Sequence, residues 1–123
     1  MTALTGIRVL LVEDDDMVAS LMSDLLDVLG CEVAGTVSRL SDAIHAAQTA
    51  AIDIAILDVN LEGRPVYPVA DALIARHIPA IFCTGYGRAG IDTKYQSMPV
   101  LTKPFDLSTL EQTLVSAIAS RRA

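Results

Sequence analysis

Residues 54–58 read Ile54-Ala55-Ile56-Leu57-Asp58, an apolar run that ends in a carboxylate. An unbroken apolar run of this length is typical of a strand buried on both faces of a parallel sheet. Three further apolar runs also end in groups suited to handling phosphate. They are residues 7–12, followed by Glu13 and Asp14; residues 80–83, followed by Thr84; and residues 100–102, followed by Lys103. The carboxyl ends of parallel strands share one edge of a sheet, so we expect these side chains to meet there.

Segments with helical spacing of apolar residues separate the strand-like runs. Apolar residues recur at spacings of three and one over residues 18–29, and Gly30 is a suitable stop for this helix. Asp15 and Asp16 are expected to cap it, because acids favour helix N-termini. A short strand then precedes a second helix, which Ser38 is predicted to cap. This alternation favours a doubly wound α/β fold, with a parallel sheet covered on both faces.

One segment departs from the alternation. A helix is expected between Thr84 and Pro99, but Gly85, Gly87 and Gly90 fall within six residues. Inside a helix each glycine costs about 1 kcal/mol relative to alanine. The sequence therefore predicts a short, late or mobile helix at this point.

Length and composition limit the class of protein. A chain of 123 residues, 52% of them hydrophobic, is sufficient for a single domain over residues 1–123. The formal net charge of −6 argues against binding to nucleic acid, which needs clustered basic residues. No apolar stretch reaches the ~18 residues of a membrane span. Cys31 and Cys83 are expected to be buried, reduced thiols, which favours a cytoplasmic protein. We also expect the protein to be a monomer or a weak dimer.

The acids at the predicted sheet edge need a counter-charge. Glu13, Asp14 and Asp58 would repel one another, and Mg²⁺ relieves such repulsion because it binds carboxylate oxygens while retaining several waters. Asp58 is either a satisfied structural acid or a nucleophile, since carboxylates can be phosphorylated to mixed anhydrides. Phosphoryl transfer depends mainly on neutralising charge. Mg²⁺, the Lys103 ammonium and the Thr84 hydroxyl are candidates for that role.

These residues stand in motifs that resemble the receiver domain of two-component response regulators. The matching motifs are Val12-Glu13-Asp14, Leu57-Asp58-Val59-Asn60, Thr84-Gly85 and Lys103-Pro104-Phe105. The resemblance covers essentially the whole chain. It implies a flavodoxin-like sheet of five strands in the order 2-1-3-4-5 and a cis peptide bond between Lys103 and Pro104.

The resemblance also implies a role for each site residue, with Asp58 as the phosphoacceptor and Mg²⁺ as the cofactor. The implied metal residues are Asp14, Asp58, Asn60 through its carbonyl, and Glu13 through water. The residues implied to contact the phosphoryl group are Thr84 and Lys103.

A subgroup is suggested by the stretch Phe82-Cys83-Thr84-Gly85-Tyr86-Gly87. It resembles the signature of single-domain receivers called FAT GUY proteins, which are similar to regulators that pair with HWE-type histidine kinases. Val100 is a departure, because most receivers have Tyr or Phe three residues before the lysine. We therefore predict that activation orders residues 85–98 around the phosphorylated site, with Tyr86 or Tyr95 partly replacing the missing ring.

The predicted function is that of a stand-alone response regulator with no enzymatic activity on a separate metabolite. It would take its phosphoryl group from a histidine kinase or phosphotransfer protein, and then contact a target protein or act as a phosphate sink or shuttle. Two alternatives remain open. A pseudo-receiver would never carry phosphate. A haloacid-dehalogenase-type phosphohydrolase would use residues 14–16 as its Asp-x-Asp motif, although nothing supplies its second acidic pair.

Overall fold

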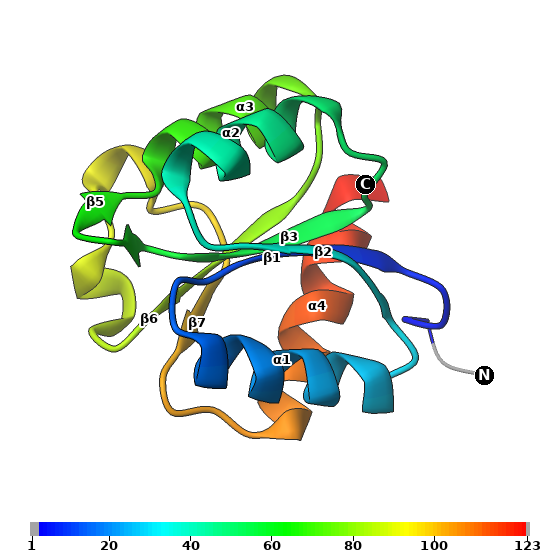
Figure 1. The fold of residues 1–123 in the computed structure, drawn as a ribbon. Helices are drawn as coiled ribbons and strands as arrows, with labels where there is room; N and C mark the ends of the chain where they lie inside the picture. Colours follow the sequence, from blue (N-terminus) through cyan, green and yellow to red (C-terminus); the bar gives the residue numbers. More distant parts are fainter. Residues whose placement is uncertain (1–2, 123) are drawn as a thin grey trace.

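Helices cover both faces of a central β-sheet (Figure 1). The structure is a computed structural model that describes the backbone of residues 3–122 and the side chains of residues 3–120. The strands of the central sheet are β1 (Arg8–Val12), β2 (Glu32–Val37), β3 (Ile54–Asp58), β6 (Ala80–Thr84) and β7 (Val100–Thr102). The helices are α1 (Asp16–Val28), α2 (Leu40–Thr49), α3 (Tyr67–Ala75) and α4 (Leu107–Arg122).

All strands of the central sheet run parallel, in the order β2-β1-β3-β6-β7. The two remaining strands, β4 (Asn60–Leu61) and β5 (Arg64–Pro65), form a separate antiparallel hairpin. Numbered along the chain, the five strands of the large sheet therefore stand in the order 2-1-3-4-5. The predicted doubly wound fold and its strand order are confirmed.

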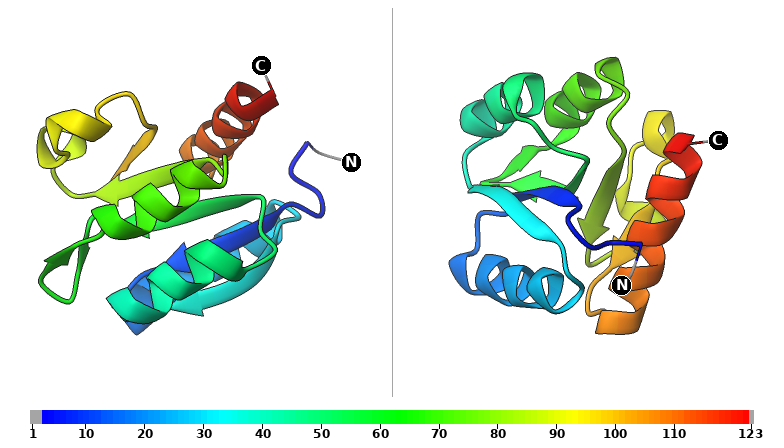
Figure 2. Two further views of the ribbon diagram at one scale, coloured as in Figure 1. Left: turned by 90° about the horizontal axis from the view of Figure 1, so that it is seen from above. Right: turned by 90° about the vertical axis from the view of Figure 1, so that its right-hand side faces the viewer.

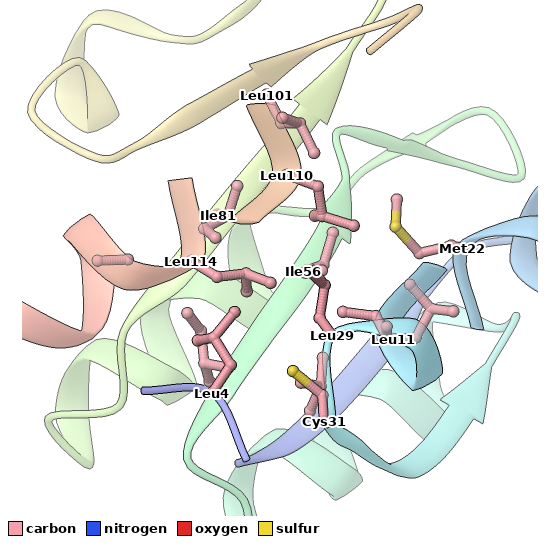
Figure 3. Close-up of a cluster of buried hydrophobic side chains, with 14 of the residues drawn as sticks. Leu4, Leu11, Met22, Leu29, Cys31, Ile56, Ile81, Leu101, Leu110 and Leu114 are labelled. Carbon is pink, nitrogen blue, oxygen red and sulfur yellow. The ribbon is translucent and has the colours of Figure 1, made fainter. Parts of the chain in front are cut away.

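Successive side chains along each strand point to opposite faces of the sheet, so the hydrophobic core is divided between these two faces. Ile54 and Ile56 of β3 pack in the cluster that α1 and α4 cover. Figure 3 shows Ile56 within this cluster. Ala55 and Leu57 pack on the opposite face, beneath α2 and α3. The two layers of helices are seen on either side of the sheet in Figure 2. Because both faces of β3 are covered, the strand has no polar side chain before Asp58.

Local chemistry explains where several helices begin and end. Asp15 accepts hydrogen bonds from two amides of the first turn and so caps α1, as predicted. After α1, Gly30 has a φ of +86°, a left-handed conformation that favours glycine. The prediction that Ser38 caps α2 is wrong. Arg39 has an extended backbone and occupies the N-cap without a side-chain bond, so the helix starts only at Leu40.

The segment between β6 and β7 is irregular. Residues 85–99, all of them described, contain no α-helix but two short 3₁₀ turns, η1 (Gly87–Gly90) and η2 (Thr93–Tyr95). Gly87 has a φ of +58°, which is unfavourable for residues with a side chain. The helix expected here is reduced to these two short 3₁₀ turns, while its mobility stays a prediction. Within the described part of the chain, no helix has the length and apolar character needed to cross a membrane.

Candidate functional site

The carboxyl edge of the sheet brings the predicted site residues together. Asp58 is the last residue of β3 and Thr84 the last of β6, while Glu13 and Lys103 directly follow β1 and β7. The Glu13 amide donates to the Val37 carbonyl at 3.0 Å, and the Lys103 amide donates to the Thr84 carbonyl at 2.8 Å. Backbone pairing therefore continues past the strand ends and fixes the chain where the functional side chains emerge. The predicted cis bond between Lys103 and Pro104 is present.

Lys103 lies between two carboxylates. Its Nζ is 3.4 Å from Glu13 Oε1 and 3.8 Å from Asp58 Oδ2. Burial raises the pKa of Glu13 to about 7, and the nearby Asp58 adds to this shift. Burial lowers the pKa of Lys103, but Asp58 and Glu13 outweigh that effect, so the net shift of its pKa is upward. The ammonium is therefore held in its charged form beside Asp58.

Three carboxylates form a cluster that fits a divalent cation. One oxygen from each of Glu13, Asp14 and Asp58 lies within 4.8 Å of the others. The Glu62 amide donates to Asp14 Oδ2 at 2.9 Å, and the Asn60 amide donates to Asp58 Oδ1 at 3.4 Å. Three acids beside a single lysine leave an excess of negative charge on hard oxygen ligands. Mg²⁺ matches this donor set, because it prefers carboxylate oxygens and keeps part of its water shell.

Thr84 provides a hydroxyl group at the same edge of the sheet. Its side chain is only 5% exposed, and Oγ1 accepts a hydrogen bond from the Tyr86 amide at 3.1 Å. A hydroxyl that accepts a bond still has its own proton to donate. The Tyr86 ring, in contrast, is 83% exposed.

The β4–β5 hairpin positions Asp14 through a hydrogen bond that the periodicity of the strands does not reveal. In the turn of the hairpin, Glu62 and Gly63 have φ values of +52° and +79°. This turn brings the Glu62 amide to Asp14, and the hydrogen bond between them orients the acid. The Glu62-Gly63 pair is the one sequence signal for it, since glycine is favoured in turns with positive φ.

Three aromatic rings pack beside the irregular segment. The rings of Tyr67 and Tyr95 are stacked with centroids 4.4 Å apart, and Phe82 meets them edge-on at 5.8 and 5.9 Å. The Tyr95 hydroxyl donates to Asp71 Oδ1 at 2.7 Å, which ties η2 to α3. Val100, half-buried, pairs with Phe82 across the sheet. The space around Phe82 thus holds two tyrosine rings from outside β7.

Both cysteines are buried thiols without a disulfide, as predicted. Burial raises the pKa of Cys83 to about 12 and also raises the pKa of Cys31. Both therefore remain protonated at neutral pH, which keeps them unreactive as nucleophiles.

Two features together define a class of signalling domain. They are the parallel sheet in this strand order and the acids, hydroxyl and lysine at its carboxyl edge. The sequence matches the family model of the response regulator receiver domain over residues 9–115, and the chain belongs to this family. It is thus a receiver domain of two-component signalling.

Solved structures of receivers are similar over nearly the whole chain. The solution structure of SdrG from Sphingomonas melonis Fr1 has a TM-score of 0.82 and 39% identity, covering 96% of this chain and 99% of that one. The BeF3-activated conformation of SdrG from Pseudomonas melonis Fr1 gives a TM-score of 0.79 at 39% identity over the same shares of the two chains. The receiver domain of PhyR from Erythrobacter litoralis gives 0.84 at 25% identity, covering 99% of this chain and 97% of that one.

A curated relative comes from Bacillus subtilis (strain 168) and is named uncharacterized transcriptional regulatory protein YbdJ. It is 31% identical over 107 residues, which cover 82% of this chain and 46% of the relative. The chain therefore spans about half the length of this relative. The term transcriptional in its name refers to that longer protein and is not carried over to this chain.

Proposed function

We propose that this chain is a response regulator whose Asp58 accepts a phosphoryl group from a histidine kinase or phosphotransfer protein. One observation carries the proposal: Lys103 Nζ lies 3.8 Å from Asp58 Oδ2, at an edge where three carboxylates also cluster. A purely structural ion pair would need only one acid. Three clustered acids, two of them within 4 Å of the lysine, instead suit a site that gathers cations to receive an anionic group.

Each side chain has a role in the transfer. A carboxylate oxygen of Asp58 attacks the phosphorus of a phosphohistidine, so that a P–O bond forms while the P–N bond breaks and the imidazole leaves with the electron pair. The Lys103 ammonium neutralises charge on the phosphoryl oxygens, and the Thr84 hydroxyl donates a hydrogen bond to one of them. Water later attacks the acyl phosphate, releasing inorganic phosphate and restoring Asp58.

The metal belongs to the same proposal. The residues that would hold Mg²⁺ are Glu13 through water, Asp14, Asp58, and Asn60 through its carbonyl. When bound, the ion supplies positive charge to the oxygens of Asp58 and of the incoming group. The chain's own part is to hold the three carboxylates close together, which the Glu62 amide supports by orienting Asp14.

The output is proposed to be contact with a target protein, or phosphate storage in a relay. The similarity to SdrG, which is matched over 99% of its solved chain, supports the receiver domain as the unit that makes this contact. The FAT GUY subgroup and an HWE-type donor remain predictions. Comparing transfer rates from HWE-type kinases and from other histidine kinases tests both.

Intact mass spectrometry after incubation with acetyl phosphate and Mg²⁺ tests the acceptor. We expect a gain of one phosphoryl group that is lost at alkaline pH and is absent in Asp58→Asn. The matched control is Asp24→Asn, which removes an exposed acid on α1 and should be phosphorylated like the wild type.

The same experiment separates the alternatives. The absence of an adduct, both from acetyl phosphate and from a panel of phosphorylated kinases, would identify a pseudo-receiver. Rapid hydrolysis of a small phosphate ester such as p-nitrophenyl phosphate, dependent on Asp14, would favour the phosphohydrolase.

A further inference from the structure

Gly90 in η1 lies against the hydroxyl of Thr84. A Cβ atom added to Gly90 would stand 2.9 Å from Thr84 Oγ1 and 3.1 Å from Tyr86 Cβ. Contacts this short require one of the atoms to move. The φ of Gly90 lies outside the left-handed region, so the backbone conformation itself does not require glycine here. The requirement comes from the space that the hydroxyl occupies.

The hydroxyl is held in that space from its other side. Thr84 Oγ1 accepts a hydrogen bond from the Tyr86 amide at 3.1 Å, and the side chain is buried. Threonine is β-branched, so its χ1 angle has few favourable positions, and leaving this one breaks the bond to Tyr86. The Thr84 hydroxyl therefore has a defined resting position, with the Tyr86 amide as its partner.

The turn that carries Gly90 cannot easily move away. Arg88 donates to the carbonyls of Gln96 and Met98, at 2.6 and 3.1 Å, and Gln96 Nε2 donates back to the carbonyls of Arg88 and Ile91. These bonds close the segment on itself. A side chain at position 90 is thus more easily accommodated by rotation of Thr84 than by a shift of η1.

We propose that Gly90 is a positioning residue for Thr84: its lack of a side chain keeps the hydroxyl in a resting position on the Tyr86 amide. A phosphoryl group on Asp58 would accept the proton of this hydroxyl, and rotation of Thr84 toward that group would take Oγ1 away from the Tyr86 amide. Drawing the hydroxyl toward the phosphoryl oxygens frees the Tyr86 amide, which links the site to the segment of residues 85–98. This last step rests on the proposed function, while the contact between Gly90 and Thr84 does not.

A double-mutant cycle tests the contact without phosphate. The variants are Gly90→Ala, Thr84→Ala and the two combined, and the measurement is the midpoint of thermal unfolding. We expect the loss caused by Gly90→Ala to shrink by at least half in the Thr84→Ala background, because the clashing hydroxyl is gone. Effects of alanine on local backbone preference occur in both backgrounds and cancel in the cycle. An equal loss in both backgrounds would overturn the proposal.

Gly85→Ala is the matched control, because a Cβ at that position meets nothing within 4 Å and its φ also lies outside the left-handed region. It adds the same methyl group to the same segment. We expect its effect on the midpoint to be the same with Thr84 and with Ala at position 84. A dependence on Thr84 as large as that of Gly90→Ala would also count against the proposal.

Amide hydrogen exchange of Tyr86, followed by NMR, reports the hydrogen bond directly. We expect Gly90→Ala to speed this exchange at least tenfold in the unphosphorylated protein, toward the rate that beryllofluoride and Mg²⁺ produce in the wild type. An unchanged Tyr86 amide in Gly90→Ala would refute the positioning role. A wild type that does not respond to beryllofluoride would instead count against the proposed function, and the thermal cycle would still decide the role of Gly90.

Discussion

At the level of single residues, the site depends on a balance of charge. Lys103 is within 4 Å of both Glu13 and Asp58, while Asp14 joins them in the acidic cluster. The raised pKa of Glu13, about 7, reflects burial and the neighbouring Asp58, both of which disfavour its charge. The lysine offsets part of this cost, and an incoming cation would offset the rest. Residue types at strand ends were sufficient to predict this set, because a charged group after a buried strand needs a partner nearby.

The role of Lys103 in phosphorylation leads to the first prediction. Lys103→Met keeps most of the side-chain length but removes the ammonium 3.8 Å from Asp58. We expect the rate of phosphorylation by acetyl phosphate to fall by roughly 100-fold, as when one preorganised group that stabilises developing charge is removed. The control is Lys94→Met, since Lys94 is the one other lysine of the sequence and lies exposed in η2. Equal rates in both variants would exclude a direct role for Lys103.

At the level of elements, the irregular segment is attached to α3 through its aromatic side chains. Tyr95 stacks on Tyr67 and donates to Asp71, while the Tyr67 hydroxyl accepts from the Asp92 amide at 2.8 Å. Glycine content predicted a short, late or mobile helix here, and the segment forms only two 3₁₀ turns. The stack itself was not predictable, because it joins residues from two elements whose relative position follows only from the packed fold.

The bond between Tyr95 and Asp71 is expected to stabilise this attachment. Tyr95→Phe removes the hydroxyl and leaves the stacked ring in place, so the free energy of unfolding should fall by about 1 kcal/mol, a usual net value for one hydrogen bond. Urea denaturation measures the change. Tyr86→Phe is the matched control, since the Tyr86 ring is exposed and loss of its hydroxyl should leave the unfolding midpoint unchanged. Similar losses in both variants would show that the bond to Asp71 adds no stability.

The start of α4 should make stability depend on pH. The Thr109 amide donates to Asp106 Oδ1 at 2.8 Å, and this bond lowers the pKa of Asp106 from its usual 3.8. A carboxyl whose pKa is lowered by folding stabilises the protein above its unfolded pKa and loses this effect as the pH falls through its folded pKa. Asp106→Ala should therefore lower the urea midpoint at pH 6, and the deficit relative to wild type should shrink toward pH 3. Ser108→Ala, in the same helical turn, should give a difference that does not vary with pH. A constant deficit in Asp106→Ala would contradict a charged cap.

At the level of the whole molecule, the parallel sheet explains why the strands and the site residues could be predicted. Contacts that depend on the packed fold could not be predicted. Apolar runs such as residues 54–58 predicted the strands, and the polar residue after each run predicted the site, because parallel strands end at one edge. The Ser38 cap failed because capping preference is only a local tendency, and the helix begins one residue later than it suggested, with Arg39 as an extended N-cap. The amide of Glu62 on Asp14 escaped prediction for a related reason, since it joins distant parts of the chain through a hairpin turn.

Because the acidic cluster forms only when β1 and β3 are paired, Mg²⁺ should stabilise the whole fold. An ion that binds the folded state alone raises the free energy of unfolding by about 2.7 kcal/mol at a concentration 100 times its dissociation constant. We expect the thermal midpoint of the wild type to rise with Mg²⁺ and the rise to disappear in Asp14→Asn, which removes one of the three clustered carboxylates. Asp16→Asn should retain it, because Asp16 is exposed at the start of α1 and stands outside the cluster. A Mg²⁺-dependent rise of equal size in Asp14→Asn would place the ion elsewhere, since a carboxylate that holds the metal cannot be neutralised without weakening its binding.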